Sequence, residues 1–266
     1  MTSNRLPVDI GIDGHVHTSL CRHASGSMAE YVTSAIRAGL HSIIFLEHLE
    51  AGIKNDRRTW LSTRDFASYF ATGKQLQQQY GGRIRIFLGV EIGWNPHAVE
   101  ELQEILQRFP WQWRGLSYHF YWNGSRHLNL VSHNQEEIRQ LIRTGSKRIL
   151  NHYFHQIIQA HQTLECDVVC HLDAALRHVP GIKLTADHLH LIQTLFQDMK
   201  RKGTRLEINT SGLAMRGLPF PDPEIVHLAL RHGICLQAGS DAHHPDQVGR
   251  FFHLLPDLLK DSDPGR

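Results

Sequence analysis

The feature that most constrains this chain is a regular alternation of short apolar runs with longer amphipathic segments. The apolar runs predict seven strands, at residues 8–17, 42–48, 83–94, 114–120, 166–173, 205–211 and 234–243. Helical periodicity predicts seven helical segments, at residues 27–40, 63–80, 96–109, 135–164, 185–203, 222–233 and 245–260. Strands and helices that alternate in this way favour parallel βα units joined by right-handed crossovers.

Two architectures are built from such units, a closed barrel and an open doubly wound sheet. At 266 residues the chain has the size of a single α/β barrel, and no composition break or linker divides it. We therefore expect an α/β fold with one closed, barrel-like domain over residues 1–266. The first helix has a clear start and stop, with Ser27 as N-cap, Glu30 three residues later and Gly39 at its end.

Charge and hydropathy exclude several classes of protein. Lys and Arg number 28 and Asp and Glu number 26, and the two signs are interspersed, so no basic stripe marks a nucleic-acid partner. The first residues lack an apolar run long enough for a signal peptide, and no stretch of eighteen apolar residues suggests a membrane span. We expect a cytoplasmic protein with no membrane partner. Four cysteines without paired spacing suggest neither disulfides nor a zinc ribbon.

Histidine is the unusual component, with 21 residues, and many of these histidines fall at predicted strand ends. In a parallel barrel the carboxyl ends of all strands open onto one face, where ligands bind. The polar residues that we expect to meet there are His15, His17, His48, Glu91, His119, His171, Asp241 and His243.

The spacing of these residues favours a metal site. His15 and His17 stand two apart on a strand and therefore project to the same side, and Asp241 and His243 repeat that spacing. A single histidine of this kind is more often a core residue bonded to a backbone carbonyl. Burying eight imidazoles and carboxylates together without a cation would leave many polar groups in need of partners. The convergence therefore predicts bound metal.

Six motifs in this order also resemble a known family. They are "DGHVHTSLCRHASG", "FLEHLE", "GVEIGW", "GLSYHF", "DVVCHLD" and "GSDAHHPDQVG". The pattern is similar to the PHP superfamily, named for polymerase and histidinol phosphatase, and covers the chain from Asp13 to about Phe252. The segments "LEINTSGL" and "HLDAALRH" look like the histidinol-phosphatase branch.

The resemblance implies a distorted (β/α)7 barrel with three metal ions. The first ion would be held by His15, His17, Asp241 and a bridging Glu91, and the second by Glu91, His119 and His171. The third would be held by His23, His48 and His243; the role of His23, which lies in a loop, rests on the family match alone. The mixed imidazole and carboxylate donors suit zinc, manganese or iron. Cys21 and Cys170 lie beside these ligands, where packing is favoured over a thiolate role.

Such a centre would activate a bridging water for in-line attack on a phosphate ester. The candidate catalytic residues are Glu91, Asp241 and His243. Arg177, Asn209, Ser211 and Arg216 are the candidates for substrate binding, although Arg177 could equally be a solvated charge at a helix start.

The favoured function is hydrolysis of a small-molecule phosphomonoester, with L-histidinol phosphate as the best substrate. The resemblance leaves two alternatives, a phosphodiesterase or exonuclease acting on nucleotides or oligonucleotides, and a metal-binding regulatory module without catalysis. The near-neutral charge disfavours the first, and the fact that all nine ligand positions of the family pattern are filled disfavours the second.

Overall fold

A computed structural model describes residues 6–260 of the chain. Residues 1–5 and 261–266 lie outside the described residues, so the two ends of the expected domain are not part of the description below. None of the helices among the described residues is both long and apolar enough to cross a membrane.

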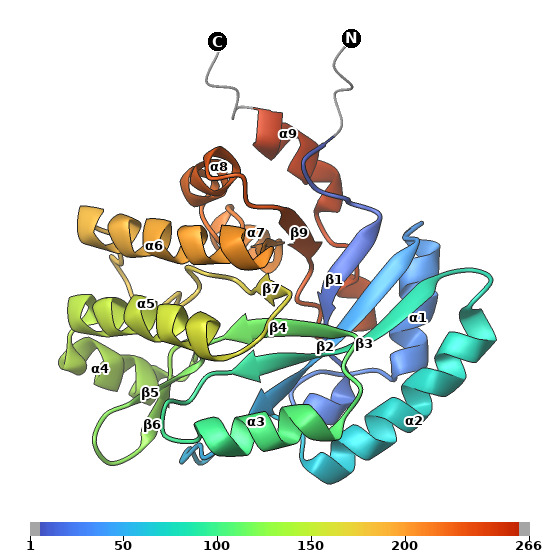
Figure 1. Ribbon diagram of the computed structural model, residues 1–266, viewed down its shortest axis with the longest axis horizontal. Helices are drawn as coiled ribbons and strands as arrows, with labels where there is room; N and C mark the ends of the chain where they lie inside the picture. The colour runs from blue at the N-terminus through green and yellow to red at the C-terminus, as the bar shows by residue number, and fades with distance from the viewer. Residues whose placement is uncertain (1–5, 261–266) are drawn as a thin grey trace.

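Seven parallel strands form one sheet that curls into a nearly closed barrel (Figure 1). In spatial order they are β1 (Ile12–Val16), β2 (Ser42–Glu50), β3 (Arg85–Gly93), β4 (Trp113–Ser117), β7 (Val168–Val169), β8 (Arg205–Asn209) and β9 (Leu236–Gly239). A parallel bridge between Val16 and Ala242 links the first strand to the segment that follows the last, where the His17 amide donates to the Ala242 carbonyl at 3.0 Å. The expected distorted (β/α)7 barrel is therefore confirmed.

The helices surround this sheet, as Figure 1 shows. The longer ones are α1 (Met28–Arg37), α2 (Thr63–Tyr80), α3 (Val99–Arg108), α4 (Gln135–Thr144), α5 (Ser146–Thr163), α6 (Ala186–Lys202) and α8 (Pro223–Arg231). The start of α1 is confirmed as a capping box, because Ser27 accepts from the Glu30 amide and Glu30 accepts from the Ser27 amide.

The structure differs from the sequence-based expectation in several places. The helical segment expected over 135–164 is divided at Gly145 into α4 and α5. Residues 114–120 were expected as one strand, but β4 ends at Ser117 and Phe120 belongs to a separate antiparallel hairpin, β5 (Phe120–Trp122) with β6 (His127–Asn129). A short helix, α7 (Ser211–Arg216), follows β8. The expected C-terminal helix is divided into η2 (Pro245–Gln247), η3 (Phe252–Leu254) and α9 (Leu255–Lys260). Gly249 and Phe251, both left-handed with φ 67° and 62°, separate η2 from η3. A further turn, η1 (Ser19–Cys21), follows β1.

The barrel interior changes character along its axis. Its lower part is a small apolar cluster of Ile44, Leu46, Val168 and Cys170, with Ile12, Phe87 and Trp113 packed against it. Because side chains alternate along a strand, the face of β2 that carries Ile44 and Leu46 continues into His48 and Glu50. The same alternation on β3 leads from Phe87 to Glu91. Inside the barrel, apolar side chains therefore lie toward the amino-terminal ends of the strands and polar side chains toward their carboxyl-terminal ends.

Glycine makes room for those polar groups. A Cβ atom on Gly93 would overlap a carboxylate oxygen of Glu50, and one on Gly239 would overlap Glu207 Oε1. Both contacts are far shorter than any real packing distance, so the close approach of a buried carboxylate requires glycine at each position.

Candidate metal centre

The nine predicted metal ligands meet at the carboxyl ends of the strands. Strands carry His15 (β1), His48 (β2) and Glu91 (β3), whereas His17, His23, His119, His171, Asp241 and His243 lie in the segments that follow strands β1, β4, β7 and β9. The structure therefore brings together residues that are as much as 228 positions apart in the sequence, as between His15 and His243.

Glu91 lies at the centre of this cluster and is fully buried. Its Oε1 lies 2.8 Å from His171 Nε2 and 3.2 Å from His119 Nε2, and it accepts a hydrogen bond from Ser117 Oγ at 2.5 Å. Its Oε2 lies 2.7 Å from His48 Nδ1, in a geometry that does not form a hydrogen bond. Both oxygens thus face imidazole nitrogens from different parts of the barrel end, which is the position that a bridging ligand requires.

A second group contains His15, His17 and Asp241, whose ligand atoms all lie within 4.8 Å of one another. The two Nε2 atoms of His15 and His17 are 3.0 Å apart, and His17 Nε2 lies 3.3 Å from Asp241 Oδ1. Asp241 holds this position in a left-handed backbone conformation with φ 51°. Strained backbone of this kind is common at functional sites, where the surrounding structure holds it in place.

A third group lies at the outer side of the cluster. His23 Nε2 lies 2.8 Å from His243 Nε2, and the other ring nitrogens, Nδ1, lie 3.0 Å from the carbonyl oxygens of Cys21 and Asp241 respectively. The ring of His48 stacks against that of His23 with centroids 5.2 Å apart. The position of His23, which strand geometry did not predict, is therefore beside the other ligands.

Electrostatics prepares these groups to bind a cation. Burial alone would raise the pKa of Glu91, but His119, His48 and His15 outweigh it and hold the pKa well below its usual range. Burial and the neighbouring His48 and His243 lower the pKa of His17 well below its usual value, and burial with the same neighbours lowers that of His23 to about 3. The carboxylate thus stays charged, while these two imidazoles stay neutral with free lone pairs.

The donor set fits divalent metal ions. Two pairs of imidazole Nε2 atoms face each other at 3.0 Å and 2.8 Å, and within residues 6–260 the buried Oε2 of Glu91 accepts no hydrogen bond. Two imidazole nitrogens that point at one another can share a single proton at most, whereas a cation satisfies both lone pairs. Nitrogen and carboxylate oxygen together are the ligands that zinc, manganese and iron accept.

Two buried carboxylates that the sequence analysis did not identify hold the imidazoles in place. Glu207 on β8 lies with Oε1 2.7 Å from His15 Nδ1, and its Oε2 accepts from the His171 amide at 2.7 Å. Glu50 on β2 lies with Oε1 2.7 Å from His119 Nδ1. In each case the carboxylate fixes one ring nitrogen and leaves Nε2 facing the site, as carboxylates behind metal-bound histidines do. The sequence did contain a signal for Glu50. It follows His48 by two residues, and side chains two residues apart on a strand face the same side.

The four residues predicted to bind substrate have different positions. Arg177 lines the cavity above the ligand cluster; the side chain is partly buried, and its buried Nε has no hydrogen-bond partner within the described part of the chain. The structure does not bring Asn209, Ser211 and Arg216 to this cavity. Asn209 is instead bonded to Glu207 at 3.2 Å and to Ser211 Oγ at 2.5 Å, and an Arg216 Nη2 lies 3.1 Å from Asp173. Because β8 is followed almost directly by α7, the side chains of Asn209, Ser211 and Arg216 bond to neighbouring protein groups and do not face the cavity.

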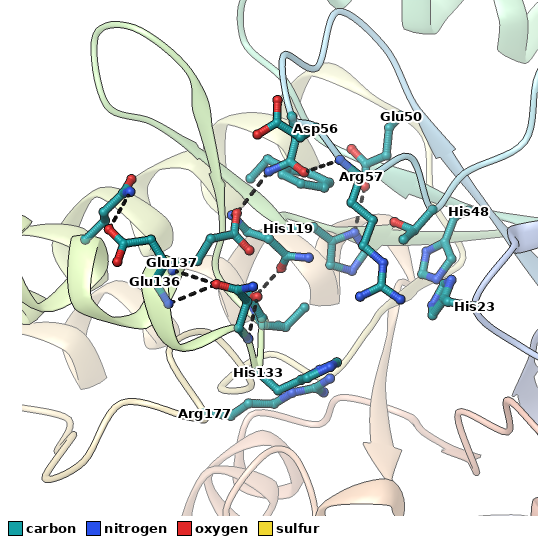
Figure 2. A pocket seen from close by; sticks show the side chains of 18 of the residues that line it. His23, His48, Glu50, Asp56, Arg57, His119, His133, Glu136, Glu137 and Arg177 are labelled. Atoms are coloured by element: carbon teal, nitrogen blue, oxygen red, sulfur yellow. Dashed lines mark hydrogen bonds and ion pairs between the residues drawn. The ribbon is translucent and has the colours of Figure 1, made fainter.

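The cavity has a volume of about 630 Å³ and is open on one side. Its floor contains His23, His48, His119, His171, Asp241 and His243, while His15, His17 and Glu91 are buried beneath. The outer wall is built from the loop at residues 51–62, the β5–β6 hairpin and the start of α4, and Figure 2 shows Asp56, Glu136 and Glu137 on this wall. The cavity is large enough for a small metabolite.

Comparisons with known proteins agree with this geometry. The "Probable histidinol-phosphatase" of Deinococcus radiodurans is 27% identical over 250 residues, which cover 92% of both chains. The histidinol-phosphatase of Bacillus subtilis is 25% identical over 261 residues, covering 91% of this chain and 97% of the relative. A histidinol phosphate phosphatase from Lactococcus lactis, crystallised with zinc, L-histidinol and phosphate, has 19% identity and a TM-score of 0.71 over 94% of this chain and 93% of its own.

The family model described as PHP domain matches residues 13–211, which is well over half of the chain. This segment contains seven of the nine predicted ligands and the carboxylates Glu50 and Glu207. The protein is therefore a member of the PHP domain family.

Proposed function

We propose that this protein is a metal-dependent phosphatase that hydrolyses L-histidinol phosphate to L-histidinol and inorganic phosphate. Its relatives in Deinococcus radiodurans and Bacillus subtilis carry the name histidinol-phosphatase over more than nine tenths of this chain. The structural neighbour from Lactococcus lactis was crystallised with both products of that reaction and with zinc. These relationships support the reaction class and the choice of substrate.

The observation that carries the proposal is the convergence of nine nitrogen and oxygen donors at and beneath the floor of one cavity that Arg177 also lines. We assign the donors to three ions. His15, His17 and Asp241 with Glu91 would hold the first, Glu91 with His119 and His171 the second, and His23, His48 and His243 the third. Divalent ions bound there would draw a phosphate group into the cavity and would lower the pKa of a water molecule, so that it could lose a proton near neutral pH and attack phosphorus.

The protein's own residues would prepare and hold the reacting groups. Glu91 remains ionised because imidazoles surround it. Burial would raise the pKa of Asp241, but His17, His15 and His243 together outweigh burial and hold that pKa well below its usual range. Arg177 would bind a phosphate oxygen from the cavity wall, where its side chain is partly buried and its Nε has no hydrogen-bond partner among residues 6–260. His243 completes the set of candidate catalytic residues from the open side of the site.

The test is elemental analysis of the purified protein combined with a screen for phosphate release. Zinc-, manganese- and iron-loaded samples would each be offered L-histidinol phosphate, other small phosphate esters and a short oligonucleotide. The proposal expects release of phosphate from L-histidinol phosphate in preference to the other esters, and removal of metal by a chelator should abolish it. Shortening of the oligonucleotide with intact small esters would instead identify a phosphodiesterase.

A further inference from the structure

We propose that Arg57 is a second phosphate-binding residue of this cavity and acts together with Arg177. The inference rests on the proposed function, because it assumes that the cavity receives a phosphate group. Figure 2 shows the Arg57 side chain extending from the 51–62 loop toward His48 and His23, while Arg177 approaches from the other side of the cavity. Neither sequence motif nor strand position marked this loop residue in advance.

The backbone that carries Arg57 is firmly held. Asn55 Oδ1 accepts from the Arg57 amide at 3.0 Å, and Asn55 Nδ2 donates to the His127 carbonyl and to Glu137 Oε1, both at 3.0 Å. Lys54 adds two further links to the hairpin, since its amide donates to His127 Nδ1 and its carbonyl accepts from the His127 amide. The loop is thus fixed to the hairpin and to α4 beside the residue that it presents.

The guanidinium of Arg57, in contrast, has no ion pair among residues 6–260. Arg126, which lines the same cavity, lies 3.1 Å from Asp56. Arg58 donates from Nε to the Trp60 carbonyl at 3.0 Å. Of the three arginines that line the cavity, Arg57 and Arg177 are therefore the two whose guanidinium groups form no ion pair within the described chain.

The acidic groups of the outer wall do not neutralise Arg57, because each already has a partner. Asp56 is paired with Arg126, Glu137 accepts from Asn55, and Glu136 lies 2.8 Å from Arg139. The guanidinium of Arg57 has no ion-pair partner in the described part of the chain, its backbone is fixed, and it is directed at the place where a phosphate group would bind. Its planar fork of N–H donors matches the spacing of two phosphate oxygens. Arg177 would supply the partly buried contact and Arg57 the exposed one, on the side from which substrate enters.

The direct test is calorimetric binding of inorganic phosphate to the metal-loaded protein. R57A should weaken phosphate binding about tenfold, as expected for the loss of a charge-assisted hydrogen bond, and R57K should recover part of the loss. R58A is the matched control, since Arg58 is the next residue on the same loop, carries the same charge and does not line the cavity. Its phosphate affinity should stay within about twofold of the unsubstituted protein.

Kinetics and metal analysis separate a binding role from a structural one. With L-histidinol phosphate, R57A should raise KM about tenfold and change kcat little, because the contact holds the phosphate before and during reaction. Metal content and the thermal midpoint should not change. Equal phosphate affinity in R57A and the unsubstituted protein, or an equal loss in R58A, would overturn the inference.

The failure of this inference and that of the proposed function are distinguishable. Phosphate binding that depends on Arg57 in a protein that does not release phosphate from any ester would support the inference and reject the proposed reaction. Ester hydrolysis with a phosphate affinity that does not depend on Arg57 would support the proposed reaction and reject the inference about Arg57. A metal-loaded protein that binds no phosphate at all would overturn both.

Discussion

His23 Nε2 and His243 Nε2 lie 2.8 Å apart, although 220 residues separate them in the chain. Each ring is oriented by a backbone carbonyl at its other nitrogen, Cys21 for His23 and Asp241 for His243. Burial lowers the pKa of both imidazoles, to about 3 for His23, so the pair favours the neutral state in which two lone pairs converge. This pair is the outermost part of the proposed centre and the one nearest to the open side of the cavity.

His243→Ala should therefore remove about one metal ion per chain, because two ligands of the third proposed ion would remain in place of three. The two inner ions do not use His243 as a ligand and should stay. Elemental analysis after gel filtration measures the change. His244→Ala is the matched control: its side chain is exposed and caps η2 by accepting from the Asp246 amide. Full metal content in the H243A protein would contradict the assignment.

Glu91→Gln tests the proposed bridge. The amide keeps the size of the side chain but removes the negative charge that faces His48, His119 and His171. Two ions should bind more weakly, and kcat should fall by about a hundredfold or more. Metal titration and phosphate release measure the two effects. Glu100→Gln, on the exposed side of α3, should change neither. Activity and metal content equal to those of the E100Q protein would exclude a bridging role for Glu91.

Glu207→Gln tests the carboxylate behind His15. Because Glu207 Oε1 lies 2.7 Å from His15 Nδ1, the Glu207 carboxylate orients the His15 ring and makes its Nε2 a stronger metal ligand. The metal affinity should fall about 10- to 100-fold, as it does when such a partner is lost elsewhere. Competition with a chelator of known affinity measures this change without reference to activity. Glu224→Gln, exposed on α8, provides the control. An unchanged metal affinity in E207Q would show that the backbone alone positions His15.

The barrel and eight of the nine clustered residues could be predicted because both depend on local patterns. Strand alternation and helical periodicity fix which residues end each strand, and parallel strands bring those ends together. His23 lies in a loop, so its position was predicted from the family resemblance alone. The α2 boundaries, Thr63–Tyr80, were predicted without error, since Ser62 and Asp65 form a strong helix start there.

The remaining features depend on contacts between distant segments. Glu207 is 192 residues from His15, and Glu50 is 69 residues from His119, so no local pattern pairs them. The β5–β6 hairpin has strands of only three residues, too short for a periodicity to show. Asn209 was expected in the cavity from its place at a strand end, but its side chain bonds to Glu207 and Ser211 instead. Arg57 lies in a loop whose path is set by the hairpin.

His161 on α5 provides a test of stability that is independent of the metal centre. It is fully buried, its Nε2 lies 2.9 Å from Thr204 Oγ1, and Lys202 Nζ donates to its carbonyl. Burial, and then the nearby Lys202, lower the pKa of His161 from 6.5 to about 4. The folded state thus holds the neutral imidazole, whereas the unfolded chain takes up a proton as the pH falls below about 6.5.

Since the unfolded state binds more protons between pH 6.5 and 4, stability must fall as the pH falls through this window. Urea unfolding of the metal-free protein at pH 7 and pH 5 measures the loss. His161→Gln keeps a hydrogen-bonding group beside Thr204 but does not titrate, so it should lose less stability than the unsubstituted protein, by up to about 2 kcal/mol. His190→Gln, exposed on α6, should behave like the unsubstituted protein. The same acid-induced loss in all three proteins would mean that His161 is protonated as easily in the folded state as in the unfolded chain.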